Sequence, residues 1–261
     1  MDQWNGSTAV ITGASSGIGA EFATVLARRQ CNLVLVARRE DRLRELATRI
    51  EGEYGVRVQV VSADLSLLSE VDRLAQTLAA SGTPIDVLVN NAGFATHGTF
   101  AEQDATRMNN EIAVNVAAVV ALTRALVPGM VSRGRGAVVN IASTAAFQPI
   151  PFMAVYGATK AFVLSFTEAL WGELEGSGVD ALALCPGATD TEFFDVAGES
   201  ASVGKRQTPA QVVETAMRAL DQRRRPPSVV SGCANRWSSR LPRVLPRRAT
   251  IRVTRNLVGA K

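Results

Sequence analysis

The sequence is poor in the residues that build metal centres and disulfide frameworks. It has one histidine, His97, and three widely spaced cysteines with no CxxC pair among them. Zinc sites need clusters of such ligands, and disulfide-stabilised scaffolds need many more cysteines. We therefore expect no metal site and no disulfide bonds, and the composition favours a reducing compartment, the cytoplasm.

Long hydrophobic runs are also missing. The longest apolar stretches, such as residues 116–122, are far shorter than the roughly 20 residues that a membrane-spanning helix needs. The opening MDQWNGS has neither the basic nor the apolar region of a secretory signal peptide. With 47% hydrophobic and 20% charged residues, the chain has the composition of a soluble globular protein.

Acidic residues are absent from the last part of the chain. From Gln222 onward there is no aspartate or glutamate, whereas 11 of the 28 basic residues lie there, so the net charge of +4 hides an acidic body and a basic tail. Pro242 and Pro246 exclude one long helix in this tail. Four interpretations stay open: packing beside the substrate cleft, contact with an anionic membrane surface, covering the acidic surface of the body, or a subunit contact. We expect no nucleic-acid binding, because no aromatic platform or known motif accompanies the charge.

Apolar segments alternate with amphipathic, helix-like segments along most of the chain. Continuous apolar strands in such an alternation indicate a parallel sheet covered on both faces. We predict a single-domain, Rossmann-like, doubly wound α/β fold of about seven strands over residues 1–232, followed by a basic extension over residues 233–261. The predicted strands are residues 7–13, 31–37, 56–64, 84–93, 136–143, 179–187 and 226–232.

The first predicted strand ends in TGASSGIG, residues 12–19. Glycines at this position let the backbone approach a pyrophosphate at the start of the following helix. No Lys-Ser/Thr pair follows, which disfavours a nucleotide-hydrolysing P-loop. Taken alone, a tight strand-to-helix connection would explain the glycines equally well. The predicted cofactor contacts here are Gly13, Ser15, Ser16, Gly17, Ile18 and Gly19.

The second predicted strand ends in Ala37, Arg38 and Arg39. An enzyme that reads the ribose 2′-hydroxyl of NAD places a carboxylate there, whereas guanidinium groups bind a 2′-phosphate. The sequence therefore favours NADP(H). We expect Arg38 to be the main phosphate contact and Arg39 to be either a second contact or the solvated start of a helix. Asp64 and Leu65, after the third strand, are expected beside the adenine.

The glycine turn at residues 12–19, together with further motifs, resembles that of the short-chain dehydrogenase/reductase family. The resemblance covers about residues 7–230 and rests on the order and spacing of all the motifs. It implies hydride transfer between NADP(H) and a carbonyl or secondary alcohol. The further motifs are NNAG at 90–93, Asn115, Ser143, YGATK at 156–160, and Pro186-Gly187 followed by Thr191.

Tyr156 and Lys160 are four residues apart and so share one helix face. A phenol has a pKa of about 10, and a neighbouring ammonium favours its ionised form. We therefore expect Lys160, with the oxidised nicotinamide, to lower the pKa of Tyr156. By resemblance, Tyr156 is the general acid/base, Lys160 also holds the nicotinamide ribose, Ser143 binds the substrate oxygen, and Asn115 anchors a proton-relay water. Without the resemblance, Ser143 would be read as a helix cap.

The resemblance implies further contacts with the cofactor. Asn90 is expected to line the cofactor pocket, and Thr191 to touch the nicotinamide carboxamide. His97 is expected at the pocket mouth. Members of the family usually form dimers or tetramers through the helices near residues 107–127 and 155–175. The remaining predicted cofactor contacts are Asn91, Ala92, Gly93, Pro186, Gly187, Thr189 and Thr191.

Three segments, residues 93–98, 145–153 and 191–205, are expected to border the substrate. Their apolar side chains suggest a hydrophobic ketone or alcohol, such as a lipid, steroid, terpenoid or acyl group, unless they pack inside the fold. The Gly- and Ser-rich stretch after residue 191 is expected to form a mobile lid. The side chains in question are Phe94, Phe147, Ile150, Phe152, Phe193 and Phe194.

Two other functions stay open on the same fold. A non-catalytic dinucleotide sensor would not need the intact Ser143, Tyr156 and Lys160. A peripheral membrane or nucleic-acid binder would act through the basic tail. A Ser-His-Asp hydrolase is disfavoured, because His97 has no G-x-S-x-G nucleophile to serve.

Overall fold

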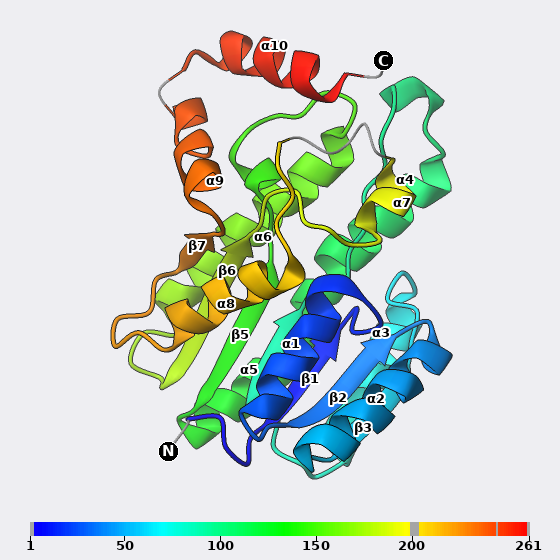
Figure 1. Ribbon diagram of the computed structural model, residues 1–261, viewed down its shortest axis with the longest axis vertical. Coiled ribbons are helices and arrows are strands. Elements are labelled where there is room, and N and C mark those ends of the chain that lie inside the picture. The colour runs from blue at the N-terminus through cyan, green and yellow to red at the C-terminus, as the bar shows by residue number, and fades with distance from the viewer. Residues whose placement is uncertain (1–2, 199–203, 244, 260–261) are drawn as a thin grey trace.

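The computed structural model describes residues 3–198, 204–243 and 245–259. These residues form a seven-stranded sheet in the order β3-β2-β1-β4-β5-β6-β7, with every neighbouring pair parallel (Figure 1). The predicted doubly wound fold is therefore confirmed. The strands are β1 (Thr8–Thr12), β2 (Asn32–Ala37), β3 (Val58–Ser62), β4 (Val87–Asn90), β5 (Gly136–Ile141), β6 (Val179–Cys185) and β7 (Ser228–Val230).

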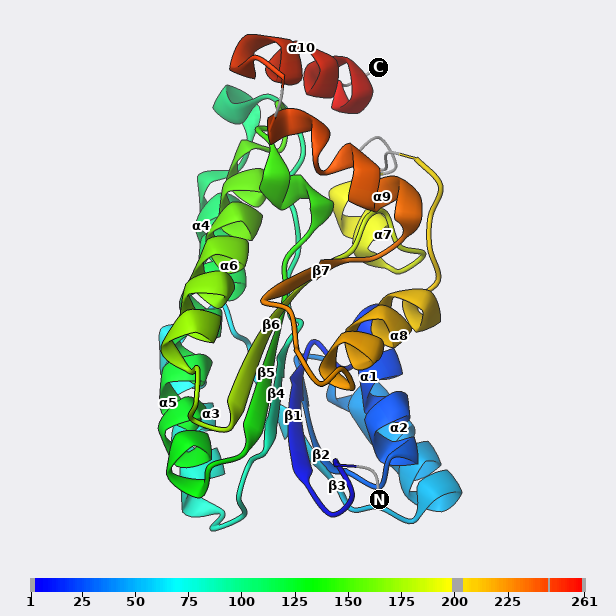
Figure 2. The same cartoon turned by 90° about the vertical axis from the view of Figure 1, so that its left-hand side faces the viewer.

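Helices cover both faces of the sheet (Figure 2). One face carries α1, α2 and α8, and the other carries α3, α5 and α6. The helices are α1 (Gly17–Arg28), α2 (Glu40–Tyr54), α3 (Leu68–Ala80), α4 (Ala105–Ile112), α5 (Ala118–Arg133), α6 (Ala154–Glu173), α7 (Phe193–Ala197), α8 (Pro209–Leu220), α9 (Cys233–Ser238) and α10 (Arg247–Val258).

Alternate side chains of each central strand enter opposite layers of the core. In β1, Ala9 and Ile11 join the layer under α1 and α2, whereas Val10 joins the layer under α3 and α5. Val10 is in register with Val34 of β2 and Leu88 of β4, on the same face. Burial on both faces explains why these strands are continuously apolar in the sequence.

The chain order reverses between β1 and β4. From β1 the chain builds outward through β2 to β3, then crosses to β4 on the other side of β1. In such sheets, ligands bind in the crevice at the carboxyl ends of the strands where the order reverses. The glycine turn after β1 and the NNAG segment after β4 both lie at this point.

The helical region expected near residues 107–127 is longer than predicted. α4, a short π-helical turn, η2 (Ala113–Ala117), and α5 form one continuous helix, Ala105–Arg133. By length and composition alone this helix could cross a membrane, although its uninterrupted apolar runs are short. In this fold it is a core helix, because Ala118, Leu122 and Met130 are buried against the sheet.

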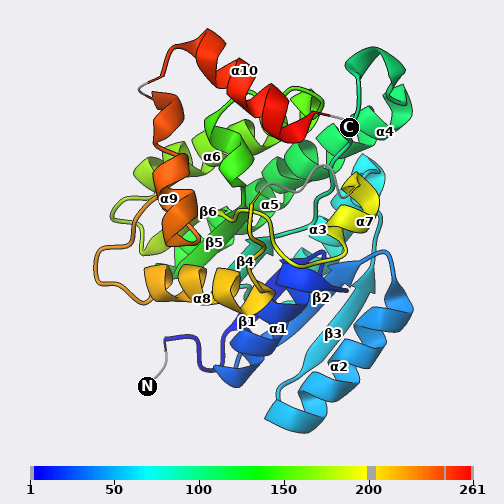
Figure 3. The same ribbon diagram turned by 45° about the horizontal axis from the view of Figure 1, so that its top comes forward.

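The basic tail forms two helices beyond the carboxyl ends of the strands (Figure 3). β7 completes the sheet, and α9 starts directly after Gly232. α9 and α10 are separate elements, as the prolines predicted, and Pro246 stands at the N-cap of α10. Both helices lie over the end of the molecule where the crevice opens.

Candidate active site

A cavity of about 770 Å³ lies at the carboxyl ends of the strands. Its size is in the range of cofactor and substrate pockets. It brings together most of the residues predicted from the motifs. These are Gly13, Ser15, Ser16, Gly17, Ile18, Arg38, Arg39, Asp64, Leu65, Asn91, Ala92, Gly93, Ser143, Tyr156, Lys160, Pro186, Gly187, Thr189 and Thr191.

The glycine turn is locked to the end of β4. The Nδ2 group of Asn91 donates hydrogen bonds to the carbonyl oxygens of Thr12 (3.0 Å) and Gly13 (3.1 Å). Gly13 has φ +64°, a backbone conformation that residues with a side chain rarely adopt, and a Cβ on Gly13 would lie 2.8 Å from Asn91 Nδ2. The turn therefore needs glycine both for its conformation and for its contact with β4.

Gly19 was predicted as a cofactor contact, but it does not line the cavity. It lies behind the turn, where a Cβ would come within 2.3 Å of the Gly13 carbonyl oxygen. Its role in this structure is close packing of α1 against the turn. Thr12, which we did not single out, has a related role: its hydroxyl accepts hydrogen bonds from the backbone N–H groups of Asn91 (2.9 Å) and Ala92 (3.0 Å).

The two arginines after β2 have different environments. Arg39 donates hydrogen bonds to the hydroxyls of Ser15 (3.0 Å) and Ser16 (3.0 Å) and forms an ion pair with Glu192 (2.7 Å). Within the described part of the chain, no hydrogen bond or ion pair engages the guanidinium of Arg38, which also lines the cavity. Arg38 is therefore the cation that is free to receive a phosphate, whereas Arg39 is already engaged.

Glu192 was not predicted, and it joins the two sides of the cavity. It lies between β6 and α7, and its carboxylate binds both Arg39 and Arg42 of the β2–α2 region. These hydrogen bonds hold the pKa of Glu192 below its usual value. Thr191, which precedes Glu192 in the chain, packs closely against Gly17. A Cβ on Gly17 would lie 2.8 Å from the Cγ2 atom of Thr191.

Asp64 lines the cavity at the end of β3, as predicted. Its carboxylate accepts hydrogen bonds from the backbone N–H (3.0 Å) and the hydroxyl (2.8 Å) of Ser66. Partial burial raises the pKa of Asp64, but these bonds and the charge of Arg38 outweigh it, so the pKa is lowered. The site thus keeps an ionised acceptor at the end of β3.

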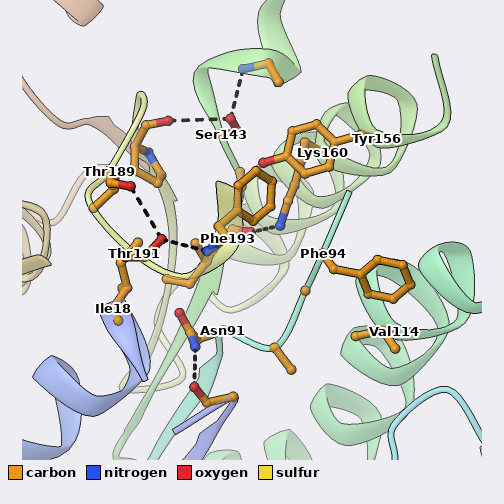
Figure 4. A pocket seen from close by; sticks show the side chains of 18 of the residues that line it. Ile18, Asn91, Phe94, Val114, Ser143, Tyr156, Lys160, Thr189, Thr191 and Phe193 are labelled. Atoms are coloured by element: carbon orange, nitrogen blue, oxygen red, sulfur yellow. Dashed lines mark hydrogen bonds between the residues drawn. The ribbon is translucent and has the colours of Figure 1, made fainter. Parts of the chain in front are cut away.

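Tyr156, Lys160 and Ser143 meet in the cavity (Figure 4). The Lys160 ammonium lies 5.7 Å from the centre of the Tyr156 ring and donates a hydrogen bond to the Ile141 carbonyl oxygen (2.7 Å). The ring of Phe193, from α7, packs at 5.5 Å against that of Tyr156. The predicted helix spacing therefore does place Tyr156 and Lys160 at the same site.

The expectation that the pKa of Tyr156 is lowered is wrong for the chain by itself. Burial raises the pKa of Tyr156 to about 12, a hydrogen bond with Ser143 lowers it, and the carboxylate of Glu111 raises it. Burial also lowers the pKa of Lys160 to about 8, although Glu111 raises it. The phenol is therefore protonated at neutral pH, which suits a proton donor.

Ser143 follows β5 and serves both interpretations offered for it. Its hydroxyl accepts a hydrogen bond from the backbone N–H of Ala145 (3.1 Å) and so caps the short helix η3 (Thr144–Phe147). The same side chain lines the cavity and bonds to Tyr156. The cap fixes the rotamer of a residue that also faces the site.

Asn115 lies just behind the cavity rather than on its wall. Its amide donates hydrogen bonds to the Phe94 carbonyl oxygen (3.0 Å) and the Thr159 hydroxyl (3.1 Å), and its oxygen accepts one from the Phe94 N–H (3.2 Å). The side chain is thus occupied by protein groups. Asn115 lies in the π-helical turn η2, a feature that is frequent at functional sites.

Glu111 is a buried acid near the site that we did not predict. It is 0% exposed, and its Oε2 accepts hydrogen bonds from the backbone N–H (2.9 Å) and the hydroxyl (2.7 Å) of Thr96. Burial raises its pKa. The available signal was its position one helical turn before Asn115, which places both side chains toward the loop that follows β4.

Three predicted lining residues lie elsewhere. Asn90, at the end of β4, points into the core, where its amide donates to Asn140 (2.8 Å) and Thr123 (3.1 Å). Phe147 packs on the buried cluster around Val163, and Phe152 lies beside His97. Packing inside the fold was the alternative for these two phenylalanines. Phe94, Ile150, Phe193 and Phe194 do line the cavity.

The expected lid is described in part. α7 carries Phe193 over Tyr156, whereas residues 199–203, the Gly- and Ser-rich part, lie outside the described residues. The basic tail closes the other side of the cavity, which is one of the four roles expected for it. A Cβ on Gly187 would lie 2.4 Å from Asn235 of α9, and His97 Nε2 lies 3.0 Å from the Val258 carbonyl oxygen of α10.

Comparisons with known proteins agree with this geometry. The family model for short chain dehydrogenases matches residues 7–201. The chain is 33% identical over 222 residues to the ketoacyl reductase HetN of Nostoc sp., which covers 84% of this chain and 77% of the relative. It is 32% identical over 221 residues to the very-long-chain 3-oxoacyl-CoA reductase of Bos taurus, covering 83% and 69%. A solved short-chain dehydrogenase from Sphingobium yanoikuyae, in complex with NADPH, superposes with a TM-score of 0.81 at 38% identity, covering 89% and 91%.

Proposed function

The chain belongs to the short-chain dehydrogenase/reductase family, and we propose that it reduces the 3-oxo group of an acyl thioester with NADPH. The family's reaction is the interconversion of a carbonyl and an alcohol. The observation that carries the substrate class is a cavity wall of apolar side chains beside Tyr156, in a chain whose curated relatives include two ketoacyl reductases. The wall is formed by Phe94, Ile150, Met153, Phe193, Leu257 and Val258.

NADP(H) is the cofactor that the residues fit. The glycine turn offers backbone at the start of α1, Arg38 offers an unengaged guanidinium after β2, and no carboxylate stands there to read a 2′-hydroxyl. The NADPH complex of the Sphingobium relative supports the same choice. When bound, NADPH supplies the hydride that goes to the carbonyl carbon of the substrate.

Tyr156 and its neighbours supply the proton. The Tyr156 hydroxyl, protonated at neutral pH, gives its proton to the carbonyl oxygen of the substrate as the carbonyl carbon becomes tetrahedral. The Ser143 hydroxyl donates a hydrogen bond to the same oxygen and stabilises the negative charge that develops on it. The Lys160 ammonium then stabilises the phenolate that remains until a proton returns from solvent. Asn115 keeps the loop after β4 against Lys160.

A substrate series tests this proposal. Consumption of NADPH is measured with 3-oxoacyl-CoA of increasing chain length and with a polar ketose about as large as the shortest acyl group. We expect kcat/KM to rise with chain length until the apolar wall is covered. Turnover of the ketose alone, or equal turnover with NADH, would contradict the substrate class or the cofactor choice, respectively.

We also propose that the protein is a homodimer that works in the cytoplasm. The outer faces of α4, η2 and α6 carry a shallow apolar hollow lined by Ile112, Val116 and Phe162, and Ile112 and Phe162 are exposed. The three cysteines, all of which lie in the described part of the chain, form no disulfide bond, which fits a reducing compartment. Light scattering on a sizing column tests the dimer, and Phe162→Glu is expected to yield a monomer.

A further inference from the structure

Exposed apolar side chains are concentrated on α9, α10 and the segment between them. Of the twelve large hydrophobic side chains that are exposed in the described part of the chain, six lie between residues 237 and 257. Monomeric proteins rarely gather exposed apolar side chains in this way without a partner. We name these six the cap hydrophobics: Trp237, Leu241, Leu245, Ile251, Val253 and Leu257.

The same surface is positively charged throughout. Exposed arginines alternate with the cap hydrophobics, and the sequence from Gln222 onward has no acidic residue. In the described residues no ion pair neutralises these arginines, and Arg240 lies over the ring of Trp237 at 5.8 Å. We name them the cap arginines: Arg236, Arg240, Arg247, Arg248, Arg252 and Arg255.

The inner face of α10 is fixed to the body of the protein, so the rest of the helix faces outward. Thr250, Thr254 and Val258, four residues apart, are buried. The Thr254 hydroxyl donates to the Pro149 carbonyl oxygen (2.9 Å), and the Val258 carbonyl oxygen lies 3.0 Å from His97 Nε2. The cap hydrophobics and cap arginines occupy the other positions of α10 except Ala249 and Asn256.

We propose that α9 and α10 together form a docking surface for an anionic lipid membrane. Helices that lie in a membrane interface combine arginine with tryptophan and aliphatic side chains: the apolar groups enter the acyl boundary while the guanidinium groups bind lipid phosphates. An acidic protein would satisfy the charge, but it would not by itself require a tryptophan that is 72% exposed among separate aliphatic side chains.

Docking would bring the mouth of the active site to the bilayer. Leu257 is exposed and also lines the cavity, and Asn235 and Ser238 of α9 line the cavity too. An acyl chain could therefore move from the lipid phase into the apolar wall without crossing water. This use of the surface rests on the proposed reductase function, whereas membrane binding itself does not depend on it.

Trp237 makes the contact measurable. Of the other two tryptophans, Trp4 is 5% exposed, and Trp171 is half-buried with its indole donating a hydrogen bond to the Arg225 carbonyl oxygen (3.2 Å). The full chain is mixed with vesicles of phosphatidylcholine, with or without phosphatidylglycerol. We expect co-sedimentation with the anionic vesicles and a blue shift of tryptophan emission, and the shift should be absent in Trp237→Phe.

Charge-reversed variants decide whether the cap arginines carry the binding. Arg248→Glu/Arg252→Glu should weaken partition to anionic vesicles at least about tenfold. Arg44→Glu/Arg49→Glu on α2 makes the same charge change elsewhere and should bind within about twofold of wild type. Neither pair lines the cavity, so turnover of a short soluble ketone, measured in parallel, tests the reductase function separately.

Four results would overturn the proposal. The wild-type chain could stay in solution with anionic vesicles, or bind neutral and anionic vesicles equally. The cap variant and the α2 variant could bind alike. Retention on a polyglutamate matrix without vesicle binding would assign the surface to an acidic macromolecule instead of a membrane.

Discussion

The two walls of the active-site cavity are built in different ways. On the cofactor wall, the ends of β1 and β4 meet so closely that Gly13 and Gly19 have no room for a methyl group. On the opposite wall, α10 is held by hydrogen bonds at Thr254 and Val258 and leaves most of its surface in solvent. The first wall presents mainly backbone to its ligand, and the second presents side chains.

This difference separates what the two walls control. A wall of close-packed backbone tolerates little change, and it binds the part of the ligand that is the same in every turnover, the dinucleotide. A wall of side chains on short helices can be altered without disturbing the sheet. We call the wall formed by α10 the cap wall. We therefore expect substitutions on the cofactor wall to change the turnover of every substrate, and substitutions on the cap wall to change the turnover of only some substrates.

The largest effect is expected at the junction of the two walls. Tyr156→Phe removes the proton donor and should lower kcat at least about 10³-fold, while NADPH affinity stays within about twofold. Tyr54→Phe is the matched control, because Tyr54 is the other tyrosine of the chain and ends α2, away from the cavity. Steady-state kinetics and NADPH fluorescence titration measure the two quantities. Full activity of Tyr156→Phe would remove the proposed mechanism.

A methyl group on the cofactor wall should be costly. In Gly19→Ala the new Cβ would meet the Gly13 carbonyl oxygen at 2.3 Å, so we expect the free energy of unfolding to fall by roughly 1–3 kcal/mol and NADPH binding to weaken. Gly172→Ala in α6 has open space around it and should leave stability unchanged or raise it by about 0.5–1 kcal/mol. Thermal unfolding compares them, and equal stability of the two variants would refute the tight packing.

Burial of Lys160 predicts a dependence of stability on pH. Its pKa is lowered from 10.5 to about 8, so between these values the unfolded chain holds a proton that the folded chain has lost. Lys160 should therefore add on the order of 2 kcal/mol to the free energy of unfolding of the cofactor-free protein between pH 8 and 10. Cys185, whose pKa burial raises from 9.0 to about 12, opposes this rise above about pH 9. Above pH 10 Tyr156, whose pKa is raised to about 12, opposes this rise.

Denaturant titrations of Lys160→Met at several pH values measure that contribution. The variant should lose most of the rise between pH 8 and 10. Lys205→Met, which changes an exposed lysine, is the control and should keep it. If both variants follow the wild-type curve, Lys160 does not lose its proton in the folded state over this range.

On the cap wall, Leu257→Ala should discriminate between substrates. Removing this apolar group from the cavity should raise KM about three- to tenfold for a long-chain 3-oxoacyl thioester and leave a short ketone unaffected. Leu68→Ala on α3 removes a leucine of similar exposure, 56% against 57%, outside the cavity. An equal rise in KM for long and short substrates would contradict this prediction, because it would mean that the substitution disturbs the fold and not a contact with the acyl chain.

The smallest effect is expected at Glu192, which binds Arg39 and Arg42 from the segment between β6 and α7. Glu192→Gln frees Arg39 and Arg42 from a carboxylate, so the affinity for NADPH should rise about two- to fivefold while that for NADH changes little. Glu214→Gln, which breaks an exposed pair with Arg218 on α8, is the control. A weaker affinity for NADPH would show instead that Glu192 orients Arg39 for the phosphate.

Much of the site followed from short stretches of sequence, and the rest depended on distant partners. Most of the glycine turn, the Ala37-Arg38-Arg39 corner, and Tyr156 and Lys160 of YGATK reach one cavity, because strand order brings the strand ends and α6 together. Glu192 was missed because its partner Arg39 is 153 positions away along the chain. Glu111 looked like any helix acid until the fold buried it against Thr96.

The sequence by itself determined the alternation of strands and helices, the glycine turn and the shared helix face of Tyr156 and Lys160, because each depends on residues within a few positions of one another. Only the tertiary structure decided which groups lost contact with water. Burial raised the pKa of Tyr156. The side chain of Asn90 lies in the core, whereas the cap hydrophobics stay exposed to solvent. The free energy of an ionisable or apolar group depends on everything packed around it, and those neighbours come from the whole chain.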